Sequence, residues 1–173
     1  MHKKPKCIIV TGRPGAGKTT LSKALGERLH LPVVSRDALK EGYVSTVGVS
    51  HDELPADANA VISNLFFELV ARYLRGNVSV IIEAAFQHKI WATRIPTLTE
   101  LADPILVTCS LDEALARERY TQRGLAHPER SFFHGDAVPG EYMPPILDVP
   151  TITVATEGEY VPSLDKLVRW ICG

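Results

Sequence analysis

Residues 12–19 read Gly-Arg-Pro-Gly-Ala-Gly-Lys-Thr, and this stretch decides the fold of the chain. It matches Gly-x-x-x-x-Gly-Lys-Ser/Thr, the pattern of the phosphate-binding P-loop. In such a loop, backbone N–H groups point at the β-phosphate, the lysine reaches the β- and γ-phosphates, and the threonine hydroxyl can ligate Mg²⁺. The pattern therefore assigns nucleotide binding to the loop and the residue after it: Gly12, Arg13, Pro14, Gly15, Ala16, Gly17, Lys18, Thr19 and Thr20.

The residues on both sides of the loop favour this interpretation. Four apolar residues at 7–10 precede it, as a buried strand would, and Leu21, Leu25 and Leu29 follow at a spacing of one helical turn. The phosphates would then lie at a helix N-terminus, where partial positive charge gathers. A chance match to the four fixed positions is expected in about one random chain in a hundred of this length. The sequence thus predicts a protein that binds a nucleoside triphosphate.

Length and charge limit what else the chain can be. With 173 residues, of which 45% are hydrophobic and 23% charged, it is long enough for one full core, and we expect a single domain over 1–173. The formal net charge of −1 gives no overall field that would attract nucleic acid or an acidic membrane surface. A small-molecule substrate fits this balance better than a long polyanion, while oligomeric state has no signature in the sequence.

The cysteines and the N-terminus predict a cytoplasmic protein. Cys7, Cys109 and Cys172 are far apart and lack the spacing of a metal site, so we expect reduced, buried thiols. Behind the basic N-terminus only four apolar residues follow, too few for a signal peptide. No run approaches the ~20 apolar residues that span a membrane.

Apolar runs and helical periodicities alternate along the chain. Strands are predicted at 7–10, 32–35, 78–82, 105–109 and 151–156, and helices at 20–29, 56–75, 88–102, 111–123 and 163–171. Pro96 should kink or split the helix at 88–102. This alternation predicts an α/β protein with the three-layer P-loop NTPase fold, a five-stranded parallel sheet with helices on both faces. Ligands should bind beyond the carboxyl ends of its strands, where Thr11, Asp37, Glu83, Ser110 and Thr156 lie.

The order of these features resembles the P-loop small-molecule kinases, the group of zeta toxins, chloramphenicol phosphotransferase, gluconate kinase and polynucleotide kinase domains. The resemblance is carried by the P-loop, by Ser35-Arg36-Asp37 after the second strand, by Glu83 at the end of the third, and by an arginine-rich helix after the fourth. It implies an enzyme that transfers the γ-phosphoryl group of ATP, with Mg²⁺, to a hydroxyl of a small acceptor. The acceptor differs among members of the group and is not carried over.

Two carboxylates divide the expected chemistry. The resemblance places the general base at Asp37, although this residue also suits the N-cap of a following helix. Glu83 occupies the position where many P-loop proteins hold Mg²⁺ with an aspartate. Glu83 is therefore assigned to the metal together with Thr19. Because glutamate is one methylene longer than aspartate, acceptor contact and the base role are its alternatives.

Arginines are expected to close the site. Arg119 and Arg123 lie four residues apart on one helix face, a pairing that costs about 0.2–0.5 kcal/mol unless an anion lies between them. The resemblance implies a lid at about 124–149, in which Arg123 and Arg130 flank a break at Gly124 and stabilise charge during transfer. Arg119 is expected to stack on adenine or contact phosphate, and its alternative is an ion pair with an exposed carboxylate.

Other polar residues have weaker assignments. His127 and His134 are predicted to be exposed loop histidines rather than metal ligands, because no cysteine or carboxylate pattern completes a zinc set. Gln87, Trp91 and Arg94 follow the third strand, where an acceptor pocket would open, and Arg36 either contacts the acceptor or braces Asp37. Residues 38–60 are expected to line that pocket with apolar side chains and a few hydroxyl acceptors.

Two other functions compete with a small-molecule kinase. The first is a nucleotide-dependent switch or binding module with slow hydrolysis. The lack of an Asn-Lys-x-Asp guanine reader after the fourth strand argues against it. The second is a nucleic-acid 5′-hydroxyl kinase, which needs clustered basic residues that the near-neutral charge does not favour.

Overall fold

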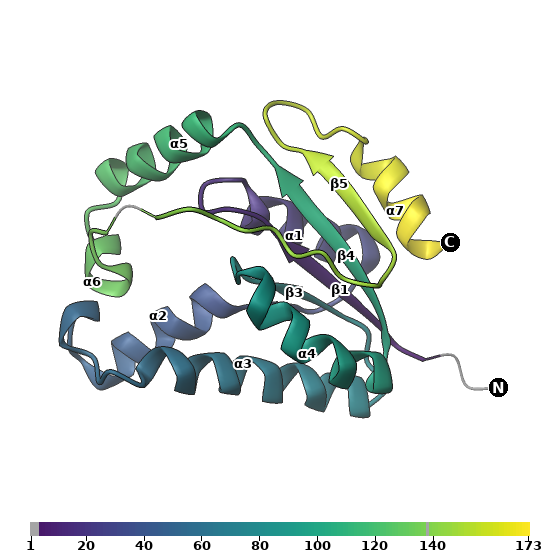
Figure 1. Ribbon diagram of the computed structural model, residues 1–173, viewed down its shortest axis with the longest axis horizontal. Coiled ribbons are helices and arrows are strands. Elements are labelled where there is room, and N and C mark those ends of the chain that lie inside the picture. Colours follow the sequence, from purple (N-terminus) through teal and green to yellow (C-terminus); the bar gives the residue numbers. More distant parts are fainter. Residues whose placement is uncertain (1–3, 138) are drawn as a thin grey trace.

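A computed structural model describes residues 4–137 and 139–173, and a five-stranded sheet lies at its centre (Figure 1). The strands are β1 (Lys6–Thr11), β2 (Val33–Ser35), β3 (Val80–Glu83), β4 (Asp103–Ser110) and β5 (Thr151–Ala155). Their order is β2-β3-β1-β4-β5, and every neighbouring pair is parallel. The predicted α/β class and its parallel sheet are confirmed.

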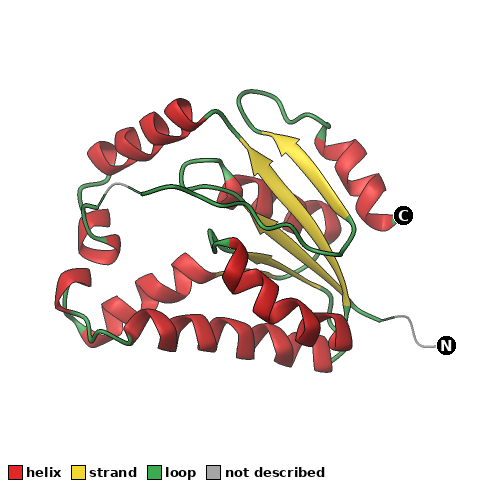
Figure 2. Ribbon diagram, viewed as in Figure 1, coloured by secondary structure: helices red, strands yellow, loops and turns green. Residues whose placement is uncertain are grey.

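The helices form a layer on each face of this sheet (Figure 2). They are α1 (Lys18–Leu29), α2 (Arg36–Val47), the 3₁₀ turn η1 (His51–Glu53), α3 (Ala58–Arg75), α4 (His88–Leu101), α5 (Glu113–Ala126), α6 (Arg130–His134) and α7 (Leu164–Cys172). Helices α1 and α7 cover one face and α3 and α4 the other, while α5 and α6 lie beyond the carboxyl ends of the strands (Figure 1). Within the described ranges, each helix is too short or too polar to cross a bilayer.

Alternation along the strands creates two separate apolar cores. Ile8 of β1 packs toward Leu21 and the other apolar residues of α1 and α7, whereas Ile9 packs toward Phe66 and Trp91 of α3 and α4. All five side chains are fully buried. The register of β1 sets Val10 beside Glu83 of β3, so the last residue of β3 is brought next to the P-loop that follows β1.

Thiol burial differs from the prediction at one position. Cys7 and Cys109 are buried, and this burial raises the pKa of each thiol to about 12. Cys172 is exposed, so the expectation of three buried thiols was wrong for this residue. Cys172 is the last residue of α7, where the helix leaves the core.

Helix α2 was not among the predicted helices, and the sequence analysis raised it only through the alternative role of Asp37 as an N-cap. Leu39, Tyr43, Val44 and Val47 were interpreted as pocket lining, yet they recur at helical spacing within a twelve-residue helix. Its N-cap is Ser35, whose Oγ accepts a hydrogen bond from the backbone N–H of Ala38 at 3.4 Å. The capping alternative for Asp37 was therefore wrong, and its carboxylate is left for another role.

The predicted lid also differs in detail. Helix α5 runs through Gly124 to Ala126, so the expected break at Gly124 is absent from this described stretch. A glycine inside a helix costs only about 1 kcal/mol relative to alanine, which the rest of the helix can offset. The short helix α6 follows within the stretch assigned to the lid, for which no helix was predicted. Helix α4 contains Pro96 and remains one helix.

Candidate functional site

A cavity of about 790 Å³ opens at the carboxyl edge of the sheet, between the P-loop, α2, α5 and α6. Most of the residues that the sequence singled out line it: Pro14, Gly15, Gly17, Lys18, Thr19, Thr20, Asp37, Glu83, Arg119, Arg123 and Arg130. They come from segments far apart in the chain, and the parallel sheet brings them together by aligning the ends of its strands.

Two glycines of the P-loop, Gly15 and Gly17, adopt backbone conformations in which a side chain would cause strain. Gly15 has a φ of +85°, and a Cβ atom there would lie 2.1 Å from the carbonyl oxygen of Ala116 in α5. Gly17 caps α1 with a φ of +79°, a left-handed conformation that favours glycine. Helix α5 therefore packs directly on the loop.

Lys18 lies against the loop that it belongs to. Its side chain is buried, and Nζ donates a hydrogen bond to the carbonyl oxygen of Arg13 at 3.0 Å. Burial lowers the pKa of Lys18, while the charges of Glu83 and Asp37 oppose this shift. The ammonium group is thus positioned beside two carboxylates and away from bulk water, as a group that receives a phosphate would be.

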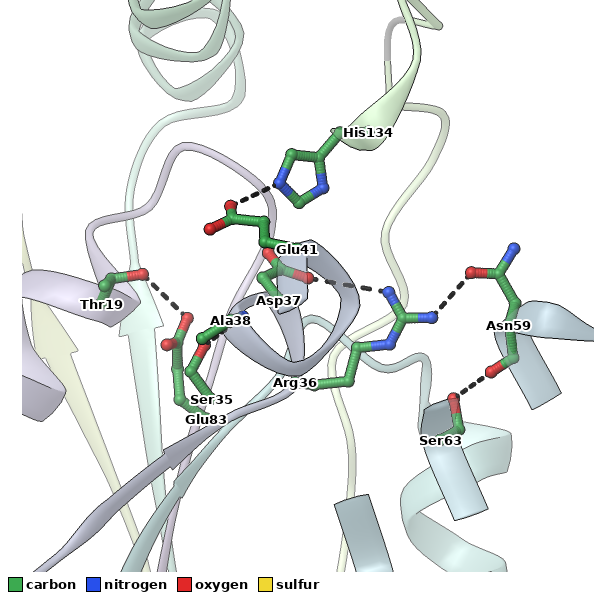
Figure 3. Close-up of polar contacts among 10 residues, drawn as sticks. All are labelled: Thr19, Ser35, Arg36, Asp37, Ala38, Glu41, Asn59, Ser63, Glu83 and His134. Carbon is green, nitrogen blue, oxygen red and sulfur yellow. Dashed lines mark hydrogen bonds and ion pairs between the residues drawn. The ribbon is translucent and has the colours of Figure 1, made fainter. Parts of the chain in front are cut away.

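Thr19 and Glu83 form a pair suited to a divalent cation. The Thr19 hydroxyl donates to Glu83 Oε1 at 3.0 Å (Figure 3). Glu83 is 2% exposed, and its Oε2 atom has no partner among the described residues. A buried carboxylate oxygen without a donor is costly, and Mg²⁺ or its water ligands would satisfy it. The residues present therefore fit Mg²⁺, although glutamate replaces the more common aspartate.

Asp37 lies in the first turn of α2 and exposes its carboxylate to the cavity. Its Oδ1 is 3.8 Å from Nη1 of Arg36, whose Nη2 donates to Asn59 of α3 at 2.8 Å. Figure 3 shows Asp37 between the Thr19–Glu83 pair and Arg36. Arg36 therefore lies close enough to brace the carboxylate, which was one of its two predicted roles.

The three predicted arginines line the same cavity but have different surroundings. Arg119 donates to the main-chain carbonyl oxygens of Thr156 at 2.9 Å and Glu157 at 2.5 Å. These bonds replace the ion pair with a carboxylate that was its alternative. Arg123 is partly buried, and burial together with the nearby charge of Arg130 lowers its pKa. An anion in the cavity would relieve this repulsion.

Three P-loop residues contact the neighbouring elements and are not among the residues that line the cavity. Arg13 forms an ion pair with Glu113 of α5 at 2.9 Å, so its side chain extends outward rather than into the cavity. The carbonyl oxygen of Ala16 accepts a hydrogen bond from the Thr156 hydroxyl at 2.8 Å. Gly12 is packed against Cys109 of β4. These contacts fix the loop to β4, β5 and α5.

The sequence analysis missed a buried polar chain behind the loop. The Thr11 hydroxyl donates to the carbonyl oxygen of Ala84 at 2.9 Å and accepts from Trp91 Nε1 at 3.2 Å. The hydroxyl of Tyr142, 131 residues away, lies 3.1 Å from the same Thr11 oxygen. No periodicity or motif marks Tyr142, so only the fold reveals this contact.

The residues predicted to open an acceptor pocket after β3 have structural contacts instead. Trp91 is fully buried, and Gln87 holds a segment within the stretch predicted as the lid. Its Oε1 accepts from the N–H of Met143 at 2.7 Å, and its Nε2 donates to the carbonyl oxygen of Glu141 at 3.0 Å. Arg94 stacks over the ring of Phe67, 4.7 Å from its centroid, and lines a separate groove between α3 and α4.

The two loop histidines differ from each other. His127 is exposed, as predicted, with Nδ1 3.1 Å from Glu129 Oε1. His134 is not an exposed loop residue, because it belongs to α6 and its side chain is 13% exposed. Its Nε2 lies 2.8 Å from Oε1 of Glu41, which joins α6 to α2 (Figure 3).

Comparison with known proteins places this site in a family. Residues 7–138 match the AAA domain family. Over 160 residues the chain is 32% identical to a Thermococcus gammatolerans protein named "Putative adenylate kinase", spanning 91% of this chain and 75% of that protein. The crystal structure of a "putative kinase" from Chloroflexus aurantiacus has a TM-score of 0.83 and 30% identity, and 98% of each chain is covered.

A gluconokinase from Sinorhizobium meliloti shares the fold, with a TM-score of 0.62 and 15% identity over 99% of this chain and 94% of that one. The family match, the Thermococcus relative and the Chloroflexus structure confirm the resemblance to the P-loop kinases. With its P-loop and these matches, the chain belongs to the AAA domain family and to the P-loop kinases.

Proposed function

We propose that this chain is an ATP-dependent kinase that transfers the γ-phosphoryl group of Mg-ATP to a hydroxyl group of a small molecule. One observation carries the proposal: a single cavity joins a phosphate-binding loop, the Thr19–Glu83 pair and the exposed carboxylate of Asp37. A switch or binding module needs the first two features, but it has no need of a proton acceptor facing the loop. The proposed use of ATP agrees with the predicted cytoplasmic location. So do the free cysteines, because disulfides are rare in that compartment.

Each group has a role in this reaction. The P-loop amides and Lys18 hold the β- and γ-phosphates, and Thr19 and Glu83 would hold Mg²⁺, which neutralises charge developing on the phosphate oxygens. The oxygen of the acceptor hydroxyl bonds to the γ-phosphorus, and Asp37 accepts the proton that this hydroxyl loses. The bond to the β–γ bridging oxygen breaks, and ADP leaves. Arg123 and Arg130 stabilise the charge on the transferred group.

Arg119 is proposed to hold the nucleotide base. Its guanidinium plane is fixed by the carbonyl oxygens of Thr156 and Glu157 while the side chain lines the cavity. An immobilised guanidinium plane presents a flat cationic face, which stacks well on an aromatic ring. Adenine would bind there, with its phosphates extending toward the loop.

The proposal is tested by incubating the protein with Mg-ATP and a library of hydroxylated metabolites, and by detecting phosphorylated products by mass spectrometry. With the acceptor identified, Asp37→Asn should lower kcat by about 10²–10⁴-fold while the Kd for ATP stays the same. Asp165→Asn is the matched control, because Asp165 is also the second residue of a helix, on the far side of the sheet. Unchanged turnover in Asp37→Asn would remove Asp37 as the base.

A second candidate is a nucleoside monophosphate kinase, favoured by the relative whose name includes adenylate kinase. In that reaction the acceptor atom is a phosphate oxygen, which carries no proton at neutral pH and needs no base. AMP belongs in the same library for this reason. Formation of ADP from AMP at a rate insensitive to Asp37→Asn would favour this candidate over transfer to a hydroxyl.

A further inference from the structure

Three nitrogen-bearing side chains gather beside the catalytic cavity, where α2 and η1 meet. They are Arg36 and Lys40 of α2 and His51 of η1, and we call them the α2 basic cluster. The turn after α6 packs closely against His51, since a Cβ atom on Gly135 would lie 2.6 Å from Cδ2 of His51. The His51 end of the cluster is thus covered by the turn after α6.

Lys40 contributes an ammonium group to the cluster. As a whole residue it is 5% exposed, but its Nζ atom is not one of the buried polar atoms that lack a partner among residues 4–137 and 139–173. A lysine can bury its aliphatic stem in this way while its ammonium group stays at the surface. Burial and the charge of Arg36 lower the pKa of Lys40, and the charges of Asp37 and Asp52 oppose this shift. The ammonium group of Lys40 is therefore available to a negatively charged group that lies beside α2.

The other two members have buried nitrogens without partners. Arg36 Nε and His51 Nδ1 are both buried, and neither has a hydrogen-bond partner in the part of the chain that the structure describes. Buried polar atoms are nearly always satisfied, so these two atoms beside the ammonium group of Lys40 indicate a missing hydrogen-bond partner. Arg36 Nε can only donate, and His51 Nδ1 donates in one of its two tautomers. A group with several anionic oxygens can accept from all three at once.

The position of the cluster connects it to the reaction. In Figure 3, Arg36 lies on the opposite side of Asp37 from the Thr19–Glu83 pair. Lys40 follows Arg36 by four residues and so lies one helical turn farther along the same face of α2. A molecule whose hydroxyl lies at Asp37 would therefore place its remaining atoms toward the cluster.

We infer that the phosphoryl acceptor is a hydroxylated acid, whose hydroxyl lies at Asp37 and whose carboxylate, phosphate or sulfate group is bound by Arg36, Lys40 and His51. This inference rests on the proposed kinase function. The carboxylate of Asp52 also faces the cluster, since it lies near Gly135 and acts on the charges of Lys40 and His51. Asp52 is exposed, so water screens its charge more than that of a buried group.

The first experiment compares acceptors that differ only in the acidic group. Glycerate is paired with glycerol, gluconate with glucitol, and glycerol 3-phosphate with glycerol, each with Mg-ATP. The acidic member of at least one pair should be phosphorylated with a kcat/KM at least about tenfold higher than its neutral partner. The carboxylate and phosphate pairs distinguish which acid is used. Equal kcat/KM values for acidic and neutral partners, with phosphorylation observed, would overturn the inference and leave the kinase function standing.

The second experiment changes the cluster itself. Lys40→Met keeps the length of the side chain and removes its charge, and it should lower kcat/KM for the acidic acceptor by about 10- to 100-fold, mainly through KM. Lys40→Arg should restore part of the loss. Lys166→Met, an exposed position on α7, is the control. The Kd for ATP should be the same in all variants, which separates acceptor binding from misfolding.

A third measurement does not depend on catalysis. Calorimetry with inorganic phosphate, and separately with acetate, is carried out after the P-loop has been saturated with a non-hydrolysable ATP analogue. Wild-type protein should bind at least one of these anions in the millimolar range, and Lys40→Met should not. Such binding without any phosphorylated product would support the anion site while the proposed kinase function failed. Lack of binding in the wild type, or equal binding in Lys40→Met, would refute the anion site.

Discussion

At the scale of single residues, the positions that line the cavity were predictable wherever a motif fixes them. The P-loop pattern located Lys18 and Thr19, and Glu83 followed from its place at the end of a strand. Contacts between distant residues were not predictable, because they depend on how the elements pack. The Glu41–His134 pair is separated by 93 residues, and nothing in either local sequence indicates it.

Gly15 is the loop position that should tolerate a side chain least. We expect Gly15→Ala to lower the free energy of unfolding by about 2–3 kcal/mol, because alanine is strained at a positive φ and its Cβ would meet the backbone of α5. ATP binding should weaken as well, since the loop must shift. Gly42→Ala, in the interior of α2 with open space around it, should instead be stabilising by about 0.5–1 kcal/mol. Urea denaturation of both variants measures the difference, and equal effects would contradict this account of Gly15.

At the scale of elements, strands and long helices were predicted well and α2 was not. Apolar runs mark buried strands because both faces of a parallel sheet are covered. In α2 only Lys40 and Val44 are buried, so its periodicity is weak beside that of α3. The missed signal for the start of α2 was a serine at position 35, since serine favours N-caps, followed by an acidic residue, Asp37, in the first turn.

The cap of α2 should matter for activity as well as stability. Ser35→Ala removes the acceptor for the Ala38 N–H, and we expect it to cost about 0.5–1 kcal/mol of unfolding free energy, because the bond is long at 3.4 Å. Asp37 lies in the turn that this bond holds, so kcat for the identified acceptor should fall while the Kd for ATP is unchanged. Ser35→Thr keeps a hydroxyl and should restore both values. A Ser35→Ala protein with wild-type stability would show that the cap contributes nothing.

At the scale of the whole molecule, the class of sheet was predictable, but the course of the chain beyond α6 was not. The segment before β5 runs along the sheet to the start of that strand and is held by Gln87, whose partners lie 54 and 56 residues away (Figure 1). Hydrogen bonds between one side chain and a distant main chain leave no periodic pattern in the sequence. The same contacts carry Tyr142 to the P-loop, so the loop is supported by a segment from the opposite end of the chain.

Because the site draws on so many elements, nucleotide binding should stabilise the entire fold. A Mg²⁺-bound, non-hydrolysable ATP analogue at a hundred times its Kd should add about 2.7 kcal/mol and raise Tm by about 5–11 °C. Differential scanning fluorimetry measures this shift, which Lys18→Ala should abolish. Glu83→Gln should reduce the shift in the presence of magnesium and leave it unchanged in the presence of a chelator. An equal magnesium-dependent shift in Glu83→Gln would exclude Glu83 as a metal ligand.

Arg119 also limits which part of α5 is free to move together with α6. Its guanidinium fastens the middle of α5 to the carbonyl oxygens after β5, and Gly15 is packed against the same helix one turn earlier. The first half of α5 is thereby anchored to the body of the protein, while its last turn and α6 are attached to α2 through the Glu41–His134 contact. A movement of Arg123 and Arg130 would pivot at Arg119, so the end of the cavity proposed to bind the base would keep its shape while the end at the P-loop opened and closed.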